Sequence, residues 1–278
     1  MSHPALVPGG VAVITGGASG IGLAAAKKLA GMEMRIVIAD RGGERLEAAR
    51  KEIGGEVLAH ECDVSKRDQL QTLNALVLDR FGGTDVLMNN AGISPATNIT
   101  GPLADWQALL DVNLWGVIHG TQVFLPDMLR RGRPGLVINT GSKQGITTPP
   151  GNPAYNVSKA GVKAFTEALE HELRNTKDAK VRAHLLIPGF VFTGMTSRGR
   201  TDKPDGAWTA EQTVDFMLQH IEKGDFYVLC PDNEVPRELD EKRILWAAGD
   251  IVENRPPLSR WHPDYGEAFK AYLERRRG

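Results

Sequence analysis

The segment from residue 11 to residue 30 constrains the fold of this chain more than any other part of it. An apolar, β-branched run, Val11-Ala12-Val13-Ile14, leads directly into the glycine-rich stretch Thr15-Gly16-Gly17-Ala18-Ser19-Gly20-Ile21-Gly22, and a helical pattern follows over residues 23–30. In a strand–turn–helix unit of this kind, the free N–H groups at the start of the helix can bind a phosphate group. The segment therefore predicts an α/β fold that holds a dinucleotide.

Each glycine of this turn has a separate task in that interpretation. Gly16 allows a sharp turn, Gly20 lets the backbone approach the pyrophosphate, and Gly22 lets the helix pack closely on the strand. The spacing is G-x3-G-x-G, and a turn with a purely structural role is the alternative. The residues expected at the cofactor are Thr15, Gly16, Ser19, Gly20, Ile21 and Gly22.

The second predicted strand, over residues 35–39, is followed by an acid, Asp40. A carboxylate about 20 residues after the glycines can bind the ribose hydroxyls of NAD. A 2′-phosphate would meet a like charge there, so Asp40 favours NAD over NADP. Arg41 argues for the opposite choice, because a guanidinium beside the same ribose could hold that phosphate. NAD is therefore the expected cofactor, with NADP as the alternative.

A tyrosine and a lysine at helical spacing form the second informative pattern. Tyr155 and Lys159 would lie side by side on one face of a helix. A cation within about 4–6 Å of a phenol can lower the phenol pKa by roughly 1–3 units from its usual value of about 10. Such a shift would make Tyr155 a general acid or base near neutral pH. A surface tyrosine stacked on a lysine side chain is the alternative for these two residues alone.

Further motifs accompany these two patterns in a fixed order, and with them the chain resembles the short-chain dehydrogenases/reductases over residues 9–232. The stretch from Thr15 to Gly22 matches the T-G-x-x-x-G-x-G loop of that family, and residues 89–92 match its N-N-A-G segment. The resemblance implies four catalytic residues, Asn113, Ser142, Tyr155 and Lys159. The further cofactor contacts that it implies are Asp40, Arg41, Asp63, Val64, Asn90, Ala91, Gly92, Tyr155, Lys159, Pro188, Gly189, Val191 and Thr193.

The resemblance also implies a mechanism. Tyr155 would exchange a proton with the substrate oxygen while hydride passes between the substrate carbon and nicotinamide C4. Ser142 would hydrogen-bond the same oxygen and stabilise its developing negative charge. Lys159 would hold the cofactor ribose and lower the pKa of Tyr155. Asn113 would position a water that connects Lys159 to solvent and completes a proton relay.

Apolar runs alternate with helical patterns along most of the chain. Seven strands are expected, over residues 11–15, 35–39, 57–62, 85–89, 136–141, 181–187 and 226–230. The alternation predicts one Rossmann-type, doubly wound parallel sheet with helices on both faces, in a single domain spanning residues 1–278. Long helices are expected over residues 103–130 and 153–175, and the resemblance implies that such helices pair between subunits of a homotetramer or homodimer.

Residues 233–278 continue beyond the family pattern and are expected to form a C-terminal extension. The extension would pack on its own domain or on a neighbouring subunit. It either covers the substrate pocket and shapes specificity, or it braces the outside of the oligomer. The second possibility is the favoured one, and the tryptophans between residues 208 and 261 keep the first open, because aromatic side chains are suited to closing an apolar pocket.

Composition excludes several classes of partner. The net charge of −1 and the lack of a nucleic-acid motif argue against DNA or RNA binding. No apolar run approaches the ~20 residues of a membrane span, and the N-terminus lacks the features of a signal peptide, so we expect a soluble, cytoplasmic protein. Cys62 and Cys230 are expected to be reduced. No metal site is expected, because His171-Glu172 lacks the second histidine of a zinc-protease motif.

The substrate pocket of the family is lined by the segments after the serine, before the tyrosine and beyond the Pro-Gly pair. Here the expected substrate contacts are Ser142, Gln144, Asn152, Tyr155, Phe190 and Met195. Their character predicts a secondary alcohol or ketone with a hydrophobic or aromatic body, although Arg198 and Arg200 could recognise an anion. The favoured function is an NAD-dependent oxidoreductase acting on that alcohol or ketone. An NADPH-dependent carbonyl reductase and a non-catalytic NAD-binding regulator are the alternatives.

Overall fold

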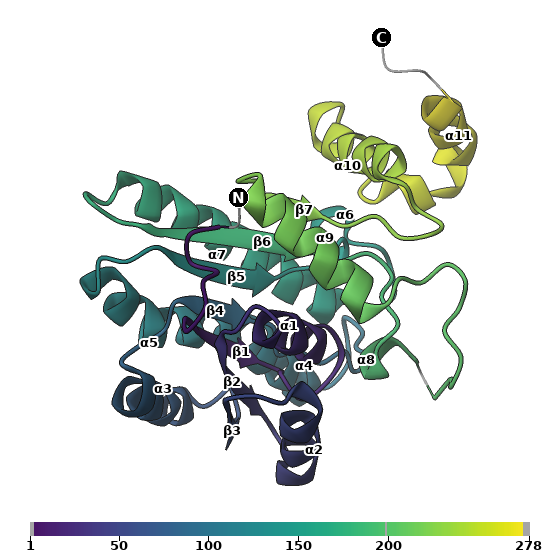
Figure 1. Ribbon diagram of the computed structural model, residues 1–278. Helices are drawn as coiled ribbons and strands as arrows, with labels where there is room; N and C mark the ends of the chain where they lie inside the picture. Colours follow the sequence, from purple (N-terminus) through teal and green to yellow (C-terminus); the bar gives the residue numbers. More distant parts are fainter. Residues whose placement is uncertain (1–2, 198, 275–278) are drawn as a thin grey trace.

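The computed structural model describes residues 3–197 and 199–274, in which a parallel sheet carries helices on both faces (Figure 1). Within these residues the sheet has seven strands: β1 (Val11–Thr15), β2 (Arg35–Asp40), β3 (Val57–Glu61), β4 (Val86–Asn89), β5 (Gly135–Thr140), β6 (Val181–Ile187) and β7 (Tyr227–Leu229). Their order is β3-β2-β1-β4-β5-β6-β7, and every pairing is parallel. The predicted doubly wound parallel sheet is confirmed.

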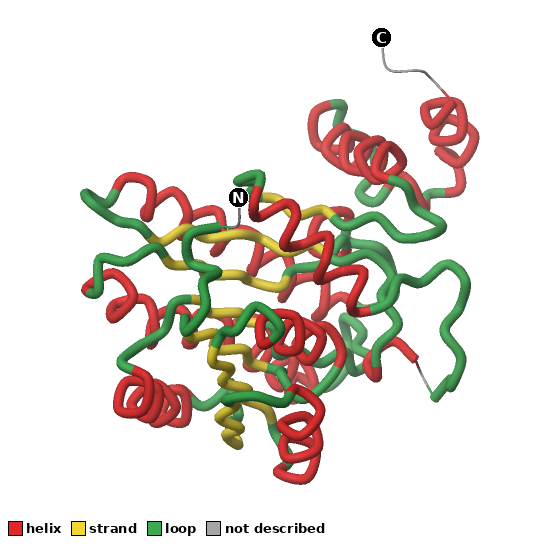
Figure 2. The backbone as a smooth tube through the Cα atoms, viewed as in Figure 1, coloured by secondary structure: helices red, strands yellow, loops and turns green. Residues whose placement is uncertain are grey.

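Helices follow nearly every strand and cover the two sides of the sheet (Figure 2). The α-helices in the described chain are α1 (Gly20–Ala30), α2 (Gly43–Ile53), α3 (Arg67–Phe81), α4 (Leu103–Leu110), α5 (Gly116–Arg130), α6 (Gln144–Thr147), α7 (Pro153–Asn175), α8 (Gly194–Ser197), α9 (Ala210–Glu222), α10 (Arg237–Val252) and α11 (Gly266–Glu274). A π-helical segment, η1 (Asp111–Trp115), joins α4 to α5, and two 3-10 turns, η2 (Ser259–Trp261) and η3 (Pro263–Tyr265), precede α11. None of the described helices combines the length and the apolar character that crossing a membrane requires.

The central strand β1 shows why the apolar runs of the sequence are continuous. Ala12 and Ile14 point into a core shared with α1, α2 and α9, whereas Val11 and Val13 point into the opposite core, shared with α3, α5 and α7. Every residue of β1 is therefore buried. A parallel strand covered on both faces needs apolar side chains at successive positions, not only at alternate ones.

The long helix expected over residues 103–130 is interrupted. Its path passes from α4 through η1 into α5, so one π-helical segment separates two α-helices. A π segment adds a residue to one turn without ending the helix, which the spacing of apolar side chains does not reveal. The other long helix, expected over 153–175, coincides with α7.

The strand order determines where a ligand can bind. The chain moves outward from β1 to β2 and β3, and then returns to place β4 on the other side of β1. The crevice at such a reversal, at the carboxyl ends of the strands, is the ligand site of open α/β sheets. The carboxyl ends of β1 and β4 carry Thr15 and Asn89, the residues that begin two of the sequence motifs.

A buried chain of polar side chains connects β4, β5 and α7. Asn89 Nδ2 donates to Asn139 Oδ1 at 2.9 Å, and Asn139 Nδ2 donates to Thr166 Oγ1 at 3.1 Å. The Thr166 hydroxyl donates in turn to the carbonyl of Val162 at 2.6 Å. Because all three side chains are buried, each of these bonds replaces water that the groups have lost.

We expect Thr166→Val to lower the free energy of unfolding by roughly 1–3 kcal/mol, because Asn139 Nδ2 would lose its acceptor inside the core. Thr72→Val on α3 is the matched control, since the exposed Thr72 also bonds the carbonyl four residues before it. Urea denaturation of both variants would measure the difference. Equal losses in the two variants would contradict a special role for the buried chain.

Candidate active site

One cavity of about 640 Å³ opens at the carboxyl ends of the central strands. Its lining is drawn from segments that are distant in the sequence, within residues 16–21, 39–45, 62–64, 90–95, 140–142, 155–159 and 188–196, with Val112 as an additional member. Most of the residues that the sequence singled out therefore meet around one space. The glycine-rich turn lies at this cavity together with Ser142, Tyr155 and Lys159.

The glycine-rich turn could not be built with other residues. Gly16 has a φ of +65°, and a Cβ on it would lie 2.8 Å from Ala91 Cα. A Cβ on Gly22 would lie 2.2 Å from the carbonyl oxygen of Gly16. Gly20 has a φ of +53° and faces Thr193 across the cavity, with 3.1 Å between its missing Cβ and Thr193 Cγ2. The turn thus brings bare backbone to the cavity wall.

The start of α1 is suited to an anion. The N-cap residue Ser19 makes no side-chain capping bond, and the first turn of α1 contains no acidic residue. The first N–H groups of the helix are therefore left for another acceptor, and the helix dipole favours a negative charge beside them. A bare glycine cradle in front of an uncapped helix start fits the pyrophosphate of a dinucleotide.

Asp40 stands at the end of β2 and lines the same cavity. One oxygen, Oδ2, accepts a hydrogen bond from the N–H of Ala18 at 3.1 Å, and Oδ1 accepts one from the N–H of Arg41 at 2.7 Å. Arg45 Nη2 lies 4.0 Å from Oδ1. The carboxylate therefore holds the glycine-rich turn in place and has two arginines close to it. Asp63 and Val64, two of the predicted cofactor contacts, line the cavity as well.

Thr15 supports the turn from below and lies outside the cavity lining. Its Oγ1 accepts hydrogen bonds from the N–H groups of Asn90 at 3.0 Å and Ala91 at 3.2 Å. Asn90 returns the contact through Nδ2, which donates to the carbonyl of Thr15 at 3.3 Å. These bonds join the first motif of the chain to the N-N-A-G segment, so that Asn90, Ala91 and Gly92 face the cavity.

Ser142, Tyr155 and Lys159 meet on one wall of the cavity. Ser142 follows β5, and the other two lie in the first turns of α7. Lys159 Nζ donates to the carbonyl of Thr140 at 2.7 Å and lies 5.8 Å from the centre of the Tyr155 ring. Ser142 Oγ accepts a hydrogen bond from the N–H of Gln144 at 3.2 Å. The predicted i, i+4 pair is thus placed above the end of β5.

Burial shifts both titratable groups of this wall. It lowers the pKa of Lys159 to about 8, because the ammonium is removed from water. Burial also raises the pKa of Tyr155, and the hydrogen bond with Ser142 opposes that rise. The lowering of the Tyr155 pKa by Lys159 stays a prediction, because burial outweighs the other influences on the phenol in the protein alone.

Asn113 lies in the π-helical segment η1 and is fully buried. Its Oδ1 accepts from the N–H of Ile93 at 2.8 Å, and its Nδ2 donates to the carbonyl of Ile93 at 2.9 Å. The side chain therefore fixes the loop that follows the N-N-A-G segment, and Ile93 itself lines the cavity. π segments inside helices often occur at functional sites.

Comparison with known proteins gives this geometry a family. The family model described as short chain dehydrogenase matches residues 10–204. This chain belongs to the short-chain dehydrogenase family. Its members are oxidoreductases that bind a nicotinamide cofactor, and the glycine cradle, the uncapped start of α1 and Asp40 fit such a group.

The names of individual relatives point to different substrates. The 3-oxoacyl-(acyl-carrier-protein) reductase FabG of Thermotoga maritima is 36% identical over 68% of this chain and 77% of its own length. The D-beta-hydroxybutyrate dehydrogenase of Rhizobium meliloti is 32% identical over 76% of this chain and 81% of its own. Among solved structures, a short-chain dehydrogenase/reductase from Burkholderia phymatum in complex with NAD has a TM-score of 0.82 and 31% identity, and covers 92% of this chain and 98% of its own.

Three predicted substrate contacts of this dehydrogenase lie outside the cavity lining. Gln144 is exposed at the start of α6. Asn152 Nδ2 donates to the carbonyl of Pro95 at 2.9 Å, and its Oδ1 accepts from Thr97 at 2.6 Å, so it tethers the 93–97 loop. The N–H of Phe190 donates to Asp232. These three roles stay predictions, whereas Ser142, Tyr155 and Met195 do line the cavity.

The arginine prediction remains partly open. Arg198 lies outside the described residues, and Arg200 is exposed in the loop after α8. Sequence reasoning missed several residues that line the cavity, among them Ile93, Ser94, Pro95 and Val112. The signal for the first three was their position directly after the N-N-A-G segment, at the carboxyl end of β4.

The depressed pKa of Lys159 gives a pH-dependent stability. In the folded chain Lys159 releases its proton near pH 8, whereas in the unfolded chain it keeps the proton to about 10.5. Between these values the unfolded state binds more protons, so the contribution of Lys159 to the free energy of unfolding becomes more favourable as the pH rises. We therefore expect the melting temperature of Lys159→Met, measured relative to that of the wild type, to fall between pH 7 and pH 10. A constant difference over that range would contradict the depressed pKa.

Proposed function

We propose that this chain is an NAD-dependent oxidoreductase that interconverts a hydrophobic or aromatic secondary alcohol and its ketone, with Tyr155 as the acid/base. The observation that carries the proposal is that Ser142, Tyr155 and Lys159 share one cavity with the glycine cradle and Asp40. A bound nicotinamide would supply the carbon that gives or accepts hydride. The protein would supply the proton transfer and the stabilisation of charge on the substrate oxygen.

Ser142 and Tyr155 would bind the substrate oxygen from one wall. Ser142 Oγ accepts a bond from the N–H of Gln144, and its own proton, which is shared with Tyr155 in the protein alone, would turn to the substrate oxygen. Tyr155 would accept the alcohol proton in oxidation and return it to the ketone in reduction. The cavity is walled by protein at this point, so both hydrogen bonds would act at low dielectric, where they stabilise developing charge most strongly.

Lys159 would complete the proton path. With a pKa of about 8, its ammonium can lose and regain a proton near neutral pH. The positive charge of a bound, oxidised nicotinamide would add to that of Lys159. Together they would favour the phenolate form of Tyr155 more than Lys159 does alone. Asn113 Oδ1 accepts from the N–H of Ile93, and its Nδ2 donates to the carbonyl of Ile93 and to Ser158 Oγ, so the side chain links the loop after the N-N-A-G segment to α7. Its positioning of a relay water stays a prediction.

The distribution of charge along the cavity supports an uncharged substrate. Charged lining residues gather at one end, namely Asp40, Arg41, Arg45 and Asp63. Elsewhere the lining is uncharged apart from Lys159 and includes the apolar side chains of Ile93, Pro95 and Met195. A carboxylate or phosphate would find no cation there other than the buried Lys159, among the residues described. A hydrophobic or aromatic alcohol suits this surface.

Tyr155→Phe is expected to reduce turnover by at least 10³-fold and to leave NAD binding unchanged, because only the transferable proton is lost. Absorbance at 340 nm would follow turnover on a panel of aliphatic, aromatic and polyol secondary alcohols, with NAD and then NADP. Calorimetry would measure NAD affinity. Normal cofactor binding without turnover by the wild type on any alcohol or ketone would favour the non-catalytic regulator.

The two arginines beside Asp40 make NADP the alternative cofactor. One substitution distinguishes a preference for NAD from a preference for NADP. Asp40→Asn keeps the shape and the bond to the N–H of Ala18 but removes the charge that would repel a 2′-phosphate. We expect the ratio of kcat/KM for NADP to that for NAD to rise about tenfold. Glu44→Gln, which removes an exposed carboxylate on α2, is the control. A wild type that prefers NADP, or an unchanged ratio, would support the carbonyl reductase alternative.

A further inference from the structure

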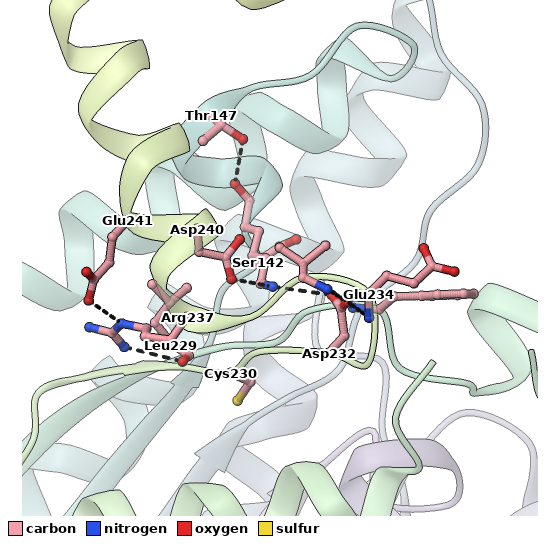
Figure 3. A network of polar contacts seen from close by, with 12 residues as sticks. Ser142, Thr147, Leu229, Cys230, Asp232, Glu234, Arg237, Asp240 and Glu241 are labelled. Carbon is pink, nitrogen blue, oxygen red and sulfur yellow. Dashed lines mark hydrogen bonds and ion pairs between the residues drawn. The ribbon is translucent and has the colours of Figure 1, made fainter. Parts of the chain in front are cut away.

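A buried ion cluster lies directly behind Ser142. The next residue, Lys143, places Nζ 2.5 Å from Asp240 Oδ2 and 3.3 Å from Asp232 Oδ2. The side chains of Asp232 and Asp240 are only 5% and 6% exposed. Figure 3 shows both aspartates in one network of polar contacts, with Ser142 close by. We call Lys143, Asp232 and Asp240 the Lys143 cluster.

The Lys143 cluster joins three segments that are distant in the sequence. Lys143 immediately precedes α6, and Asp240 lies in the first turn of α10, within the C-terminal extension. Asp232 follows β7, and its Oδ2 also accepts a hydrogen bond from the N–H of Phe190 at 3.1 Å. Its Oδ1 accepts from the N–H of Val235 at 2.8 Å. The serine segment, the Pro-Gly segment and the extension therefore meet at one ammonium.

The cluster is packed tightly against the cavity wall. A Cβ on Gly189 would lie 2.6 Å from Asp232 Oδ2 and 2.9 Å from Lys143 Nζ. On the other side of α6, a Cβ on Gly145 would lie 2.5 Å from the main-chain carbon of Lys159. The α6 segment is therefore in close contact with the Pro-Gly segment through Lys143 and with α7 through Gly145. A displacement of Lys143 would consequently move the neighbouring Ser142 relative to α7.

The charges of the cluster are expensive to bury. Two carboxylates surround one ammonium, and burial raises the pKa of Asp240 while Lys143 and then Arg243 oppose the rise. Well-packed apolar side chains would often be as stable as such a cluster. Stability alone therefore explains the cluster poorly. Directional contacts that fix one register of packing explain it better.

We propose that Asp240, acting through Lys143, is a positioning residue for Ser142, so that the C-terminal extension is part of the active site of its own chain. The inference rests on the proposed function, because it assigns Ser142 a bond to the substrate oxygen. The cavity is lined by residues between Gly16 and Thr196, so the extension acts from behind the serine rather than as a cover over the pocket. Figure 1 shows α10 beside α6, at the edge of the sheet that ends with β7.

Asp240→Asn tests the proposal with little change in shape. Lys143 would keep Asp232 as its partner, so the fold is expected to persist. We expect kcat on the best alcohol to fall roughly tenfold to a hundredfold, because small displacements of a catalytic group have effects of that size. The affinity for NAD should change less than about twofold, since the glycine cradle and Asp40 are untouched. Glu241→Gln, one residue along α10 and paired with Arg237, is the matched control.

Hydrogen exchange gives a readout that does not need a substrate. In Asp240→Asn, peptides covering residues 141–148 should exchange faster than in the wild type, while those covering 11–30 should not change. Glu241→Gln should alter neither. If no alcohol is turned over by the wild type, the proposed function fails, and the exchange experiment still decides whether the extension holds the serine segment. Unchanged exchange at 141–148 would overturn the proposal.

A double variant separates positioning from stability. Lys143→Met with Asp240→Leu replaces the ion pair by an apolar contact and leaves Asp232 on its backbone donors. We expect the melting temperature to rise above that of Lys143→Met alone, in which two buried carboxylates lack a cation, while kcat and the exchange at 141–148 remain altered. If kcat recovered toward the wild-type value together with the melting temperature, the cluster would only stabilise the fold. That result would contradict the inference.

Discussion

The bond from the Lys159 ammonium to the carbonyl of Thr140 is the contact on which the site depends. Thr140 ends β5, so this one bond attaches the first turns of α7 to the carboxyl edge of the sheet. The bond places Tyr155, one helical turn earlier, at the cavity. Ser142, which follows the same strand, lines that cavity too. Removing the ammonium from water lowers its pKa to about 8. The burial that accompanies this bond thus also lets the ammonium release its proton near pH 8.

The rest of the cavity is arranged around this wall by charge. At the far end, Asp40 holds the glycine-rich turn and has Arg45 nearby, so charged side chains are gathered there. The rest of the lining is uncharged apart from Lys159. A long ligand with a charged half and a reactive half would be oriented by this difference alone. The buried Asn89–Asn139–Thr166 chain keeps the two halves of the sheet in register beneath it.

Local patterns predicted what local physics determines. The apolar runs gave the strands because both faces of a parallel sheet are buried, and the helix from Pro153 to Asn175 followed from its own periodicity. The order of the motifs predicted that the glycine turn meets Tyr155 and Lys159. The sequence did not predict the π segment at Asp111–Trp115, since one inserted residue leaves the apolar spacing almost intact. Asn152 was expected in the pocket, but its partners, Pro95 and Thr97, are brought near only by tertiary packing.

The C-terminal extension makes a contact that the sequence could not predict and that bears on the proposed active site. It has a small core of its own, in which Trp246 donates to Ser259 at 2.7 Å and carries the Arg255 guanidinium over its ring. A segment that supports itself need not touch the catalytic domain with buried charges. Asp240 does so nevertheless, and its partner Lys143 is the residue next to Ser142, the serine of the proposed active site. Neither Lys143 nor Asp240 belongs to a motif, and their pairing spans almost a hundred residues of sequence, so only the fold could bring it to light. A contact that is costly to bury, lies outside every motif and ends beside the reacting group is best explained by what it holds in place.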